Sequence, residues 1–220
     1  MLTIRKLPVG IQDFEKLRKE EYIYVDKTEY VYRLTRVSSP YFLGRPRRFG
    51  KSLFLSTLKA YFLGKKELFE GLAIAGPEKD WIKYPVFHID FNVEGYTDLT
   101  SLYVALDTNL RNLEQQWGKN EADITPASRL LGLINRAYKQ TGRKVVVLID
   151  EYDKPLVNTL DNENLNKSIR DTLKGFYGVL KSADAHLRFV FLTGVTKFSK
   201  VSVFSDLNHL TDISLDNEFA

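Results

Sequence analysis

One stretch of the sequence, residues 44–52 (GRPRRFGKS), constrains the fold more than any other. An apolar segment, residues 41–43, comes directly before it, and apolar residues recur with helical spacing over residues 53–63 directly after it. A strand, a glycine-containing loop and a helix in this order are the context in which Gly-Lys-Ser ends a phosphate-binding loop. We therefore expect an α/β sheet with this loop at its edge and the following helix buried against it.

The end of the stretch supplies the groups that such a loop needs. Backbone N–H groups at a helix N-terminus favour an anion, because they are unpaired donors and the helix dipole adds positive potential. The expected nucleotide-binding residues are therefore Phe49, Gly50, Lys51 and Ser52. Lys51 would reach the β- and γ-phosphates of a nucleotide, and the Ser52 hydroxyl would bind Mg²⁺.

The beginning of the stretch departs from the usual spacing. The pattern places a glycine five residues before Gly50, where this chain has Arg45, and Gly44 comes one residue early. Arg47 and Arg48 add positive charge where a triphosphate would lie. The alternative is a Gly-Lys-Ser tripeptide in an ordinary loop, which also occurs by chance.

A second chemical element is residues 144–151 (KVVVLIDE). A run of β-branched residues without alternation predicts a strand that is buried on both faces in the middle of a parallel sheet. It ends in Asp150 and Glu151, at the edge where ligands bind in open α/β sheets. Asp150 would then serve Mg²⁺ and Glu151 would polarise the attacking water, as in a Walker B strand. The alternative is a turn or helix cap that contains two acids by accident.

Another buried strand is predicted over residues 187–192, and it leads into Thr193 and Thr196. A polar residue at the tip of a strand beside residues 144–151 is where a water-positioning group lies in ATPases with an extra central strand. Thr193 is the first candidate for this catalytic role and Thr196 the second, and two threonines that satisfy a turn are the alternative. Residues 207–215 are expected to supply a last strand.

The first 40 residues form a preamble to this core. The elements predicted there are a helix over residues 11–19, a strand over residues 22–28 and a helix over residues 29–36. Three polar residues at the end of that strand, Asp26, Lys27 and Thr28, are candidates for a base or ribose pocket. A helix N-cap at Thr28 together with a surface ion pair explains them equally well.

The middle of the chain predicts further elements of an α/β layer structure. Residues 84–91 alternate polar and apolar side chains, as an edge strand would, and His88 on their polar face is interpreted as structural. Helices are expected from a cap at Asp98 or Thr100 to Trp117, and over residues 126–138 and 165–180.

The composition excludes several classes of protein. The 220 residues carry a net charge of +4 and a pI near 9.0, which is milder than the imbalance of a dedicated nucleic-acid binder. The absence of cysteine excludes disulfides and thiolate metal sites. No basic-then-apolar leader and no long apolar run is visible, so we expect a cytoplasmic protein that does not enter a membrane.

Five strings in the chain together resemble the predicted AAA-ATPase-like family of bacteria, and they span nearly the whole chain: residues 24–28, 45–53, 150–155, 192–195 and 207–214. An arginine at the position of Arg45 is usual in that family. The resemblance implies an ATPase domain that is followed, in longer members, by a helical segment and a nuclease-like domain of the PD-(D/E)xK type. No Glu-x-Lys or Asp-x-Lys string occurs here, so we expect the ATPase part alone: residues 1–40 as a preamble packed on the core and residues 41–220 as the core.

The sequence thus predicts a three-layer α/β P-loop NTPase domain with a mainly parallel central sheet, which binds ATP and Mg²⁺ and hydrolyses ATP. One alternative is a nucleotide-gated switch or scaffold with little turnover. Another is a nucleic-acid-binding module that uses Arg45, Arg47 and Arg48. Besides the nucleotide, the partners to consider are further copies of the chain, as a homo-oligomer, and a nucleic acid bound through the full-length protein.

Overall fold

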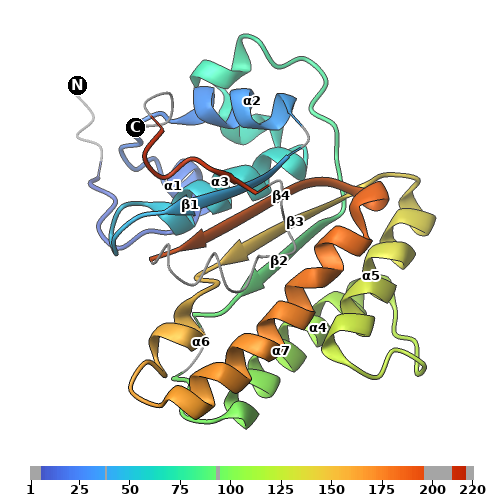
Figure 1. Ribbon diagram of the computed structural model, residues 1–220. Coiled ribbons are helices and arrows are strands. Elements are labelled where there is room, and N and C mark those ends of the chain that lie inside the picture. Colours follow the sequence, from blue (N-terminus) through green and yellow to red (C-terminus); the bar gives the residue numbers. More distant parts are fainter. Residues whose placement is uncertain (1–5, 38, 93–94, 196–209, 217–220) are drawn as a thin grey trace.

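A computed structural model describes residues 6–37, 39–92, 95–195 and 210–216 of the chain. Within these residues, five strands form one sheet in the order β2-β3-β4-β1-β5, and every neighbouring pair is parallel (Figure 1). The strands are β1 (Pro40–Gly44), β2 (Val86–Asp90), β3 (Val145–Asp150), β4 (Leu187–Gly194) and β5 (Thr211–Asp212). Because all strands run the same way, their carboxyl ends lie at one edge of the sheet, where ligands bind in folds of this kind.

Helices cover both faces of the sheet and complete three layers (Figure 1). One face is covered by α3 (Lys51–Phe62), which contacts β3 and β4 and is itself covered by α1 (Phe14–Lys19) and α2 (Thr28–Arg36). The helices of the other face are α4 (Leu99–Trp117), α5 (Pro126–Thr141) and α7 (Glu163–Ser182). The shorter helical segments are α6 (Lys154–Val157), η1 (Lys66–Phe69), η2 (Ala73–Ala75) and η3 (Asp184–His186). The predicted three-layer α/β fold with a parallel sheet is confirmed.

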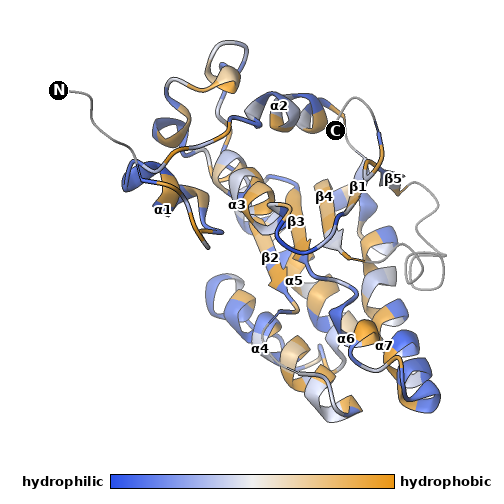
Figure 2. Ribbon diagram, turned by 90° about the vertical axis from the view of Figure 1, so that its left-hand side faces the viewer, coloured by the Kyte–Doolittle hydropathy of each residue, from blue (hydrophilic) through white to orange (hydrophobic). Residues whose placement is uncertain are grey.

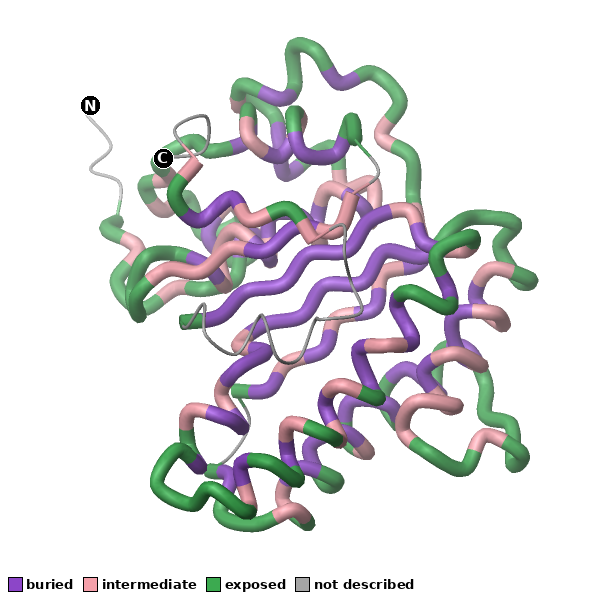
Figure 3. Tube along the Cα trace, viewed as in Figure 1, coloured by how far each residue is buried: buried purple, intermediate pink, exposed green. Residues whose placement is uncertain are grey.

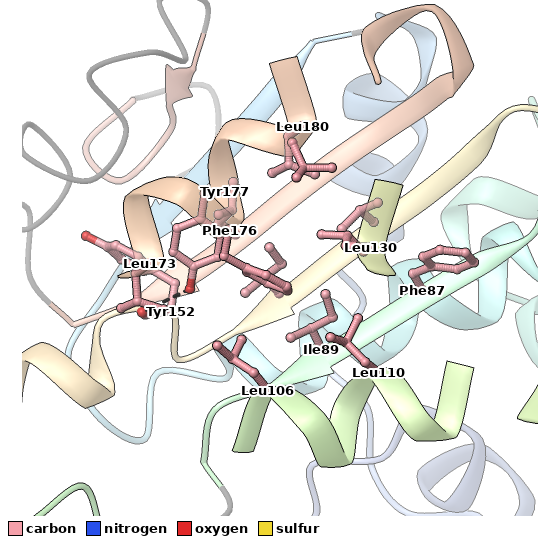
Figure 4. Close-up of a cluster of buried hydrophobic side chains, with 14 of the residues drawn as sticks. Phe87, Ile89, Leu106, Leu110, Leu130, Tyr152, Leu173, Phe176, Tyr177 and Leu180 are labelled. Carbon is pink, nitrogen blue, oxygen red and sulfur yellow. Dashed lines mark hydrogen bonds between the residues drawn. The ribbon is translucent and has the colours of Figure 1, made fainter. Parts of the chain in front are cut away.

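Strand β3 lies inside the core, as its unbroken apolar run predicts. All six of its residues are buried, and Figures 2 and 3 show the apolar, buried strands between the two helix layers. Alternate residues serve the two faces: Val147 and Ile149 pack toward α4, α5 and α7, and Val146 and Leu148 pack toward α3. Figure 4 shows part of the first cluster, with side chains of β2, α4, α5 and α7 meeting over the sheet.

The long helices of the second face begin where capping residues stand in the sequence. The carboxylate of Asp98 accepts a hydrogen bond of 2.7 Å from the backbone N–H of Ser101, so Asp98 and not Thr100 is the N-cap of α4. Thr125 caps α5 in the same way through Ser128, with Pro126 at the first helical position. These predictions from the sequence are confirmed, with α5 extending to Thr141.

The predicted strand over residues 22–28 is wrong. Residues 22–27 have no regular structure, and the N–H of Ile23 donates to the carbonyl of Lys6 and not to a strand of the sheet. Thr28 is the first residue of α2, and Lys27 is the N-cap. The side chain of Asp26 accepts hydrogen bonds from both the N–H and the hydroxyl of Thr28. The first helix is also shorter than predicted, since Asp13 caps it at Phe14.

Two further expectations concern the sheet edges. Among the described strands β2 pairs with β3 alone, so the prediction of an edge strand is confirmed. The predicted strand over residues 207–215 lies partly outside the described residues, and within them it reduces to β5, where Thr211 pairs with Tyr41. No helix in the described part of the chain combines the length and the apolar character that a membrane span requires.

Candidate nucleotide site

The loop after β1 is fixed to its neighbours at its start. The N–H of Gly44 donates to the hydroxyl of Ser214 at 2.7 Å, and the N–H of Arg45 donates to the carbonyl of Gly194 at 3.2 Å. Two residues of the loop then adopt left-handed backbone conformations, Arg48 with a φ of 69° and Gly50 with a φ of 74°. Arg48 has a side chain and is therefore strained there, and such strain concentrates at functional sites.

Helix α3 begins at Lys51, two residues before the predicted start, so Lys51 and Ser52 belong to its first turn. The Lys51 side chain is only 4% exposed and folds back under the loop. Its ammonium group donates to the carbonyls of Arg45 at 3.1 Å and Pro46 at 3.3 Å, and it lies 3.4 Å from Oε1 of Glu151. A buried ammonium is thus held at the N-terminus of a twelve-residue helix, where the helix dipole also favours an anion.

The two acids at the end of β3 have different surroundings. Asp150 is buried, and its Oδ1 accepts hydrogen bonds from the hydroxyl of Thr193 and, at 3.1 Å, from the N–H of Glu151. Its Oδ2 accepts no hydrogen bond from the described residues. Glu151 has a left-handed φ of 51°, and its carboxylate reaches Lys51. The structure therefore brings the predicted residues Lys51, Asp150, Glu151 and Thr193 together at the carboxyl edge of the sheet.

Thr193 is fully buried at the tip of β4. Its hydroxyl donates to Asp150 and also accepts, at 3.2 Å, from the N–H of Glu151. These bonds make Thr193 a positioning residue for the two acids, and a direct contact with a γ-phosphate stays a prediction. Thr196, the second candidate, lies outside the described residues.

Two more hydrogen bonds, which the sequence does not predict, join the turn after β3 to β4. The N–H of Tyr152 donates to the carbonyl of Thr193 at 2.9 Å, and the fully buried carboxylate of Asp153 accepts from the N–H of Val195 at 3.0 Å. The sequence signal for Asp153 was its place three residues after Asp150. Its burial depends on β4, which is distant in sequence.

A pocket of about 980 Å³ opens beside these residues, and we call it the phosphate-side pocket. Its walls are residues 8–12 of the N-terminal segment, the loop and first turn of α3, and the turn after β3. The residues with ionisable side chains that line it are Arg47, Arg48, Lys51, Glu151, Asp153 and Lys154. Arg47 and Arg48 are exposed, and neither forms an ion pair with a described residue. Cations outnumber acids in this lining, which suits an anionic ligand.

A second pocket of about 470 Å³ lies beyond Gly50 and Leu53, which line both pockets. We call it the apolar pocket, because most of its lining is aromatic or aliphatic: Tyr24, Val25, Tyr30, Leu34, Leu43, Phe49, Leu53, Phe54 and Ile213. Phe49, predicted as a phosphate-binding residue, is 67% exposed and lines this pocket.

Of the three polar residues proposed for a base pocket, only Lys27 lines the apolar pocket, and its ammonium lies 5.3 Å from the centre of the Tyr30 ring. Asp26 binds Thr28 and, through its other oxygen, the N–H of Ala73 at 2.7 Å. Burial raises the pKa of Asp26, but these hydrogen bonds together outweigh it and leave the pKa below its ordinary value. Hydrogen bonds at the start of α2 thus engage Asp26 and Thr28, although the N-cap predicted at Thr28 is wrong.

The side chains available as ligands limit which metal ion could bind at this site. Within the described residues, no three His, Cys, Asp or Glu side chains gather in a group that could hold a metal ion. This excludes a metal held by three such side chains from the described part of the site. Mg²⁺ in nucleotide sites needs only one or two protein oxygens, because phosphates and water complete its shell. Asp150, with one unengaged oxygen, and Ser52, which lines the phosphate-side pocket, fit that requirement.

Comparison with known proteins assigns the chain to a family. Residues 8–204 match the AAA-ATPase-like family, whose members are described as predicted AAA-ATPases. A protein of Azotobacter chroococcum mcd 1, described as an uncharacterized protein in the vnfD 5′ region, is 44% identical over 221 residues. The match covers all of this chain and 43% of that relative, so the chain spans less than half of the relative's length. No solved structure matches the chain significantly. The chain therefore belongs to the family of predicted AAA-ATPases.

Proposed function

We propose that the chain binds ATP together with Mg²⁺ and hydrolyses its terminal phosphoanhydride bond. The observation that carries this proposal is the meeting of Lys51, at the start of α3, with Glu151, which lines the same pocket and directly follows the Thr193-bound Asp150. A phosphate-binding cation, a metal-binding acid and a candidate base are the parts that phosphoryl transfer to water needs.

The phosphates are assigned to the phosphate-side pocket. Lys51 supplies a buried ammonium there, and Arg47 and Arg48 supply two cations that described acids do not neutralise. The N–H groups of the first turn of α3 add donors, since four N–H groups at a helix start have no partner within the helix.

The base is assigned to the apolar pocket, which shares Gly50 and Leu53 with the phosphate-side pocket. Tyr24, Tyr30 and Phe54 offer aromatic faces on which a purine can stack. This arrangement places the loop between base and terminal phosphate. It also explains the exposed Phe49 at the rim, because a bound base would cover part of its ring.

Catalysis is assigned to the two acids by their surroundings. When bound, Mg²⁺ neutralises charge on the β- and γ-phosphate oxygens. Asp150 and Ser52 would hold it, and Thr193 keeps the Asp150 carboxylate in place. Glu151 aligns a water and takes its proton as the water oxygen bonds to the γ-phosphorus and the bond to the β–γ bridging oxygen breaks.

One observation favours the second candidate function, a nucleotide-gated switch with little turnover. Glu151 is paired with Lys51, so the candidate base and the candidate phosphate ligand engage each other. Hydrolysis requires Glu151 to leave Lys51 once a phosphate arrives. If that exchange is slow, the chain binds ATP and changes state without turning it over at an appreciable rate.

The proposal is tested by thermal unfolding with ATP or GTP, each with and without Mg²⁺. ATP with Mg²⁺ at a hundred times its dissociation constant should stabilise the wild type by about 2.7 kcal/mol. Lys51→Ala should lose most of this ligand-induced gain, whereas Lys66→Ala, which removes an exposed charge at the start of η1, should keep it. Equal gains in wild type and Lys51→Ala, or no gain in either, would contradict nucleotide binding at this loop.

A further inference from the structure

The outer edge of β2 carries backbone groups that point away from the sheet. The N–H of Val146 donates to the carbonyl of Pro85, and the N–H of Phe91 donates to the carbonyl of Asp150. Backbone groups of alternate residues face alternate sides of a strand, so Pro85, Phe87, Ile89 and Phe91 bond toward β3. The N–H and C=O groups of Val86, His88 and Asp90 must therefore face outward.

In the part of the chain that the structure describes, one end of this outward row is capped by a neighbouring helix and the other is not. The N–H of Asp90 donates to the side-chain carbonyl of Asn109 in α4 at 3.0 Å, and the Asn109 amide donates back to the carbonyl of Asp90 at 3.0 Å. The outward groups of Val86 and His88 have no such partner among the described residues. An amide side chain thus closes the carboxyl end of the edge and leaves its amino half open to another strand.

A groove of about 690 Å³, which we call the β2 groove, runs along this open half. Val86 and His88 lie at its floor, with Lys59 of α3 on one side and Asn112 and Gln116 of α4 on the other. In Figure 3 this strand alternates between buried and intermediate residues, unlike the fully buried β3 beside it. The edge is therefore recessed between two helices and still reachable by an extended chain.

The charge of the β2 groove has one sign. Lys59, Lys83 and Arg143 line it, none of the described lining residues is acidic, and none of the three forms an ion pair with a described acid. The Arg143 guanidinium also lies 6.0 Å from the centre of the Tyr84 ring, which holds it over the groove wall. A ligand with carboxylates would find complementary charge here.

Two lining side chains end in nitrogen atoms without partners. Nε2 of His88 and Nε1 of Trp117 are buried and form no hydrogen bond with the described residues. A buried polar atom without a partner destabilises the folded protein, because it has lost its hydrogen bonds to water. A peptide in the groove would bring carbonyl groups close to both atoms, and small side-chain shifts could satisfy them.

We propose that an acidic, extended segment of a partner protein binds in the β2 groove and adds a sixth strand to the sheet at β2. Backbone pairing with Val86 and His88 would supply affinity, and Lys59, Lys83 and Arg143 would select carboxylates. A peptide fits these observations better than a nucleic acid, because phosphates would use the cations but leave the alternating N–H and C=O groups of the edge unpaired. This proposal is independent of nucleotide binding.

The probe is a fluorescein-labelled peptide of eight residues in which aspartate alternates with valine. Its binding is measured by fluorescence anisotropy. Lys83→Glu with Arg143→Glu should weaken binding about tenfold or more, because like charges would then face each other. Lys66→Glu with Lys181→Glu makes the same change in net charge on exposed residues outside the groove and should leave the affinity unchanged. Equal losses in the two double variants would overturn the proposal.

Strand addition is separated from simple charge attraction by two N-methylated peptides, one methylated at every aspartate and the other at every valine. In an extended strand only one of these sets of N–H groups faces β2, so one methylated peptide should lose binding and the other should keep it. Equal binding of the two would exclude strand pairing. Binding of oligothymidylate at the same residues without binding of the peptide would replace the proposal by a nucleic-acid surface.

Discussion

The ammonium of Lys51 lies 3.4 Å from Oε1 of Glu151, although the two residues come from different elements a hundred residues apart. This pair joins the start of α3 to the end of β3, and it holds the candidate phosphate ligand against the candidate base. While the pair is formed, Lys51 is less available to a phosphate and Glu151 is less available to a water. Substitutions of Glu151 should therefore affect ATP binding and ATP turnover in different directions.

Glu151→Gln should leave ATP binding intact or tighter and lower turnover by about 10²- to 10⁴-fold, the usual contribution of a positioned general base. ATP binding is kept because a neutral amide competes less than a carboxylate with the phosphates of ATP for Lys51. Single-turnover hydrolysis of bound ATP, compared with wild type at equal nucleotide occupancy, measures the effect. The same measurable rate in both proteins would show that Glu151 is not the base, and no cleavage in either would favour the switch.

Asp150→Asn should remove the Mg²⁺-dependent part of ATP stabilisation, because the neutral amide is a poor ligand for a hard cation. Thr193→Val is the matched comparison, since it keeps the carboxylate but removes the hydroxyl that holds it. We expect Thr193→Val to lower the free energy of unfolding by about 1–3 kcal/mol through the loss of buried hydrogen bonds. Titration of Mg²⁺ at a fixed ATP concentration distinguishes the two variants. If Asp150→Asn retains the Mg²⁺ dependence of ATP binding, Asp150 is not a ligand of the metal.

Arg47→Ala combined with Arg48→Gly should weaken ATP binding about tenfold or more, because a hydrogen bond to a charged group contributes roughly 1.5–3 kcal/mol. Glycine is chosen at Arg48 because the backbone there has a left-handed φ of 69°, which glycine adopts without strain. Lys66→Ala with Lys181→Ala is the control for net charge. An unchanged dissociation constant by calorimetry would mean that the two arginines serve a partner and not the nucleotide.

Gly194→Ala should destabilise the fold by roughly 1–3 kcal/mol, the range for overpacking in a filled site. A Cβ at this position would overlap the ring of Tyr152 and lie 2.8 Å from Oδ1 of Asp153. Gly175→Ala makes the same chemical change on the exposed side of α7, where a Cβ meets nothing within 4 Å, and should stabilise by about 0.5–1 kcal/mol. Urea unfolding of both variants checks the opposite signs.

Glu15 of α1 should give a small, pH-dependent contribution to stability. Hydrogen bonds from Lys19 and Lys65 lower the pKa of Glu15 from 4.5 to about 2. A lowered pKa means that the stabilisation is present above pH 4.5 and is lost as the pH falls toward 2. Because solvent screens this partly exposed group, we expect Glu15→Gln to cost only about 0.2–1 kcal/mol at pH 7. Urea unfolding from pH 7 to pH 3 should show this difference shrink, and a constant difference would contradict the assignment.

The sequence predicts this fold well where a local pattern and the tertiary structure agree. Val145–Asp150 is apolar without alternation and becomes a fully buried strand, and Asp98 and Thr125 cap the helices that they precede. The strand predicted over residues 22–28 fails for a physical reason. A strand needs a partner, and the N–H of Ile23 bonds to Lys6, outside the sheet.

The candidate site was predictable in its chemistry but not in all its parts. Short local motifs predict four of its residues: Lys51, Ser52, Asp150 and Glu151. In these motifs the local backbone conformation and the side chains are both set by residues that are neighbours in sequence. Such motifs do not predict Asp153 and the wall at residues 8–12, because their positions depend on packing between distant segments. The role of Thr193 as the partner of Asp150 was equally hidden, since a hydroxyl at a strand tip fits a turn just as well.

The order of strands in the sheet has a consequence for how the protein is made. β1, which leads into the candidate phosphate loop, pairs with β4 and β5, and Pro40 is paired with Val190, 150 residues later in the chain. On a ribosome that adds about 5–20 residues per second, the loop would emerge and wait several seconds or longer for its neighbour. Contacts between such distant segments also form slowly once both are present. Nucleotide binding should therefore be among the last properties that a newly synthesised chain acquires.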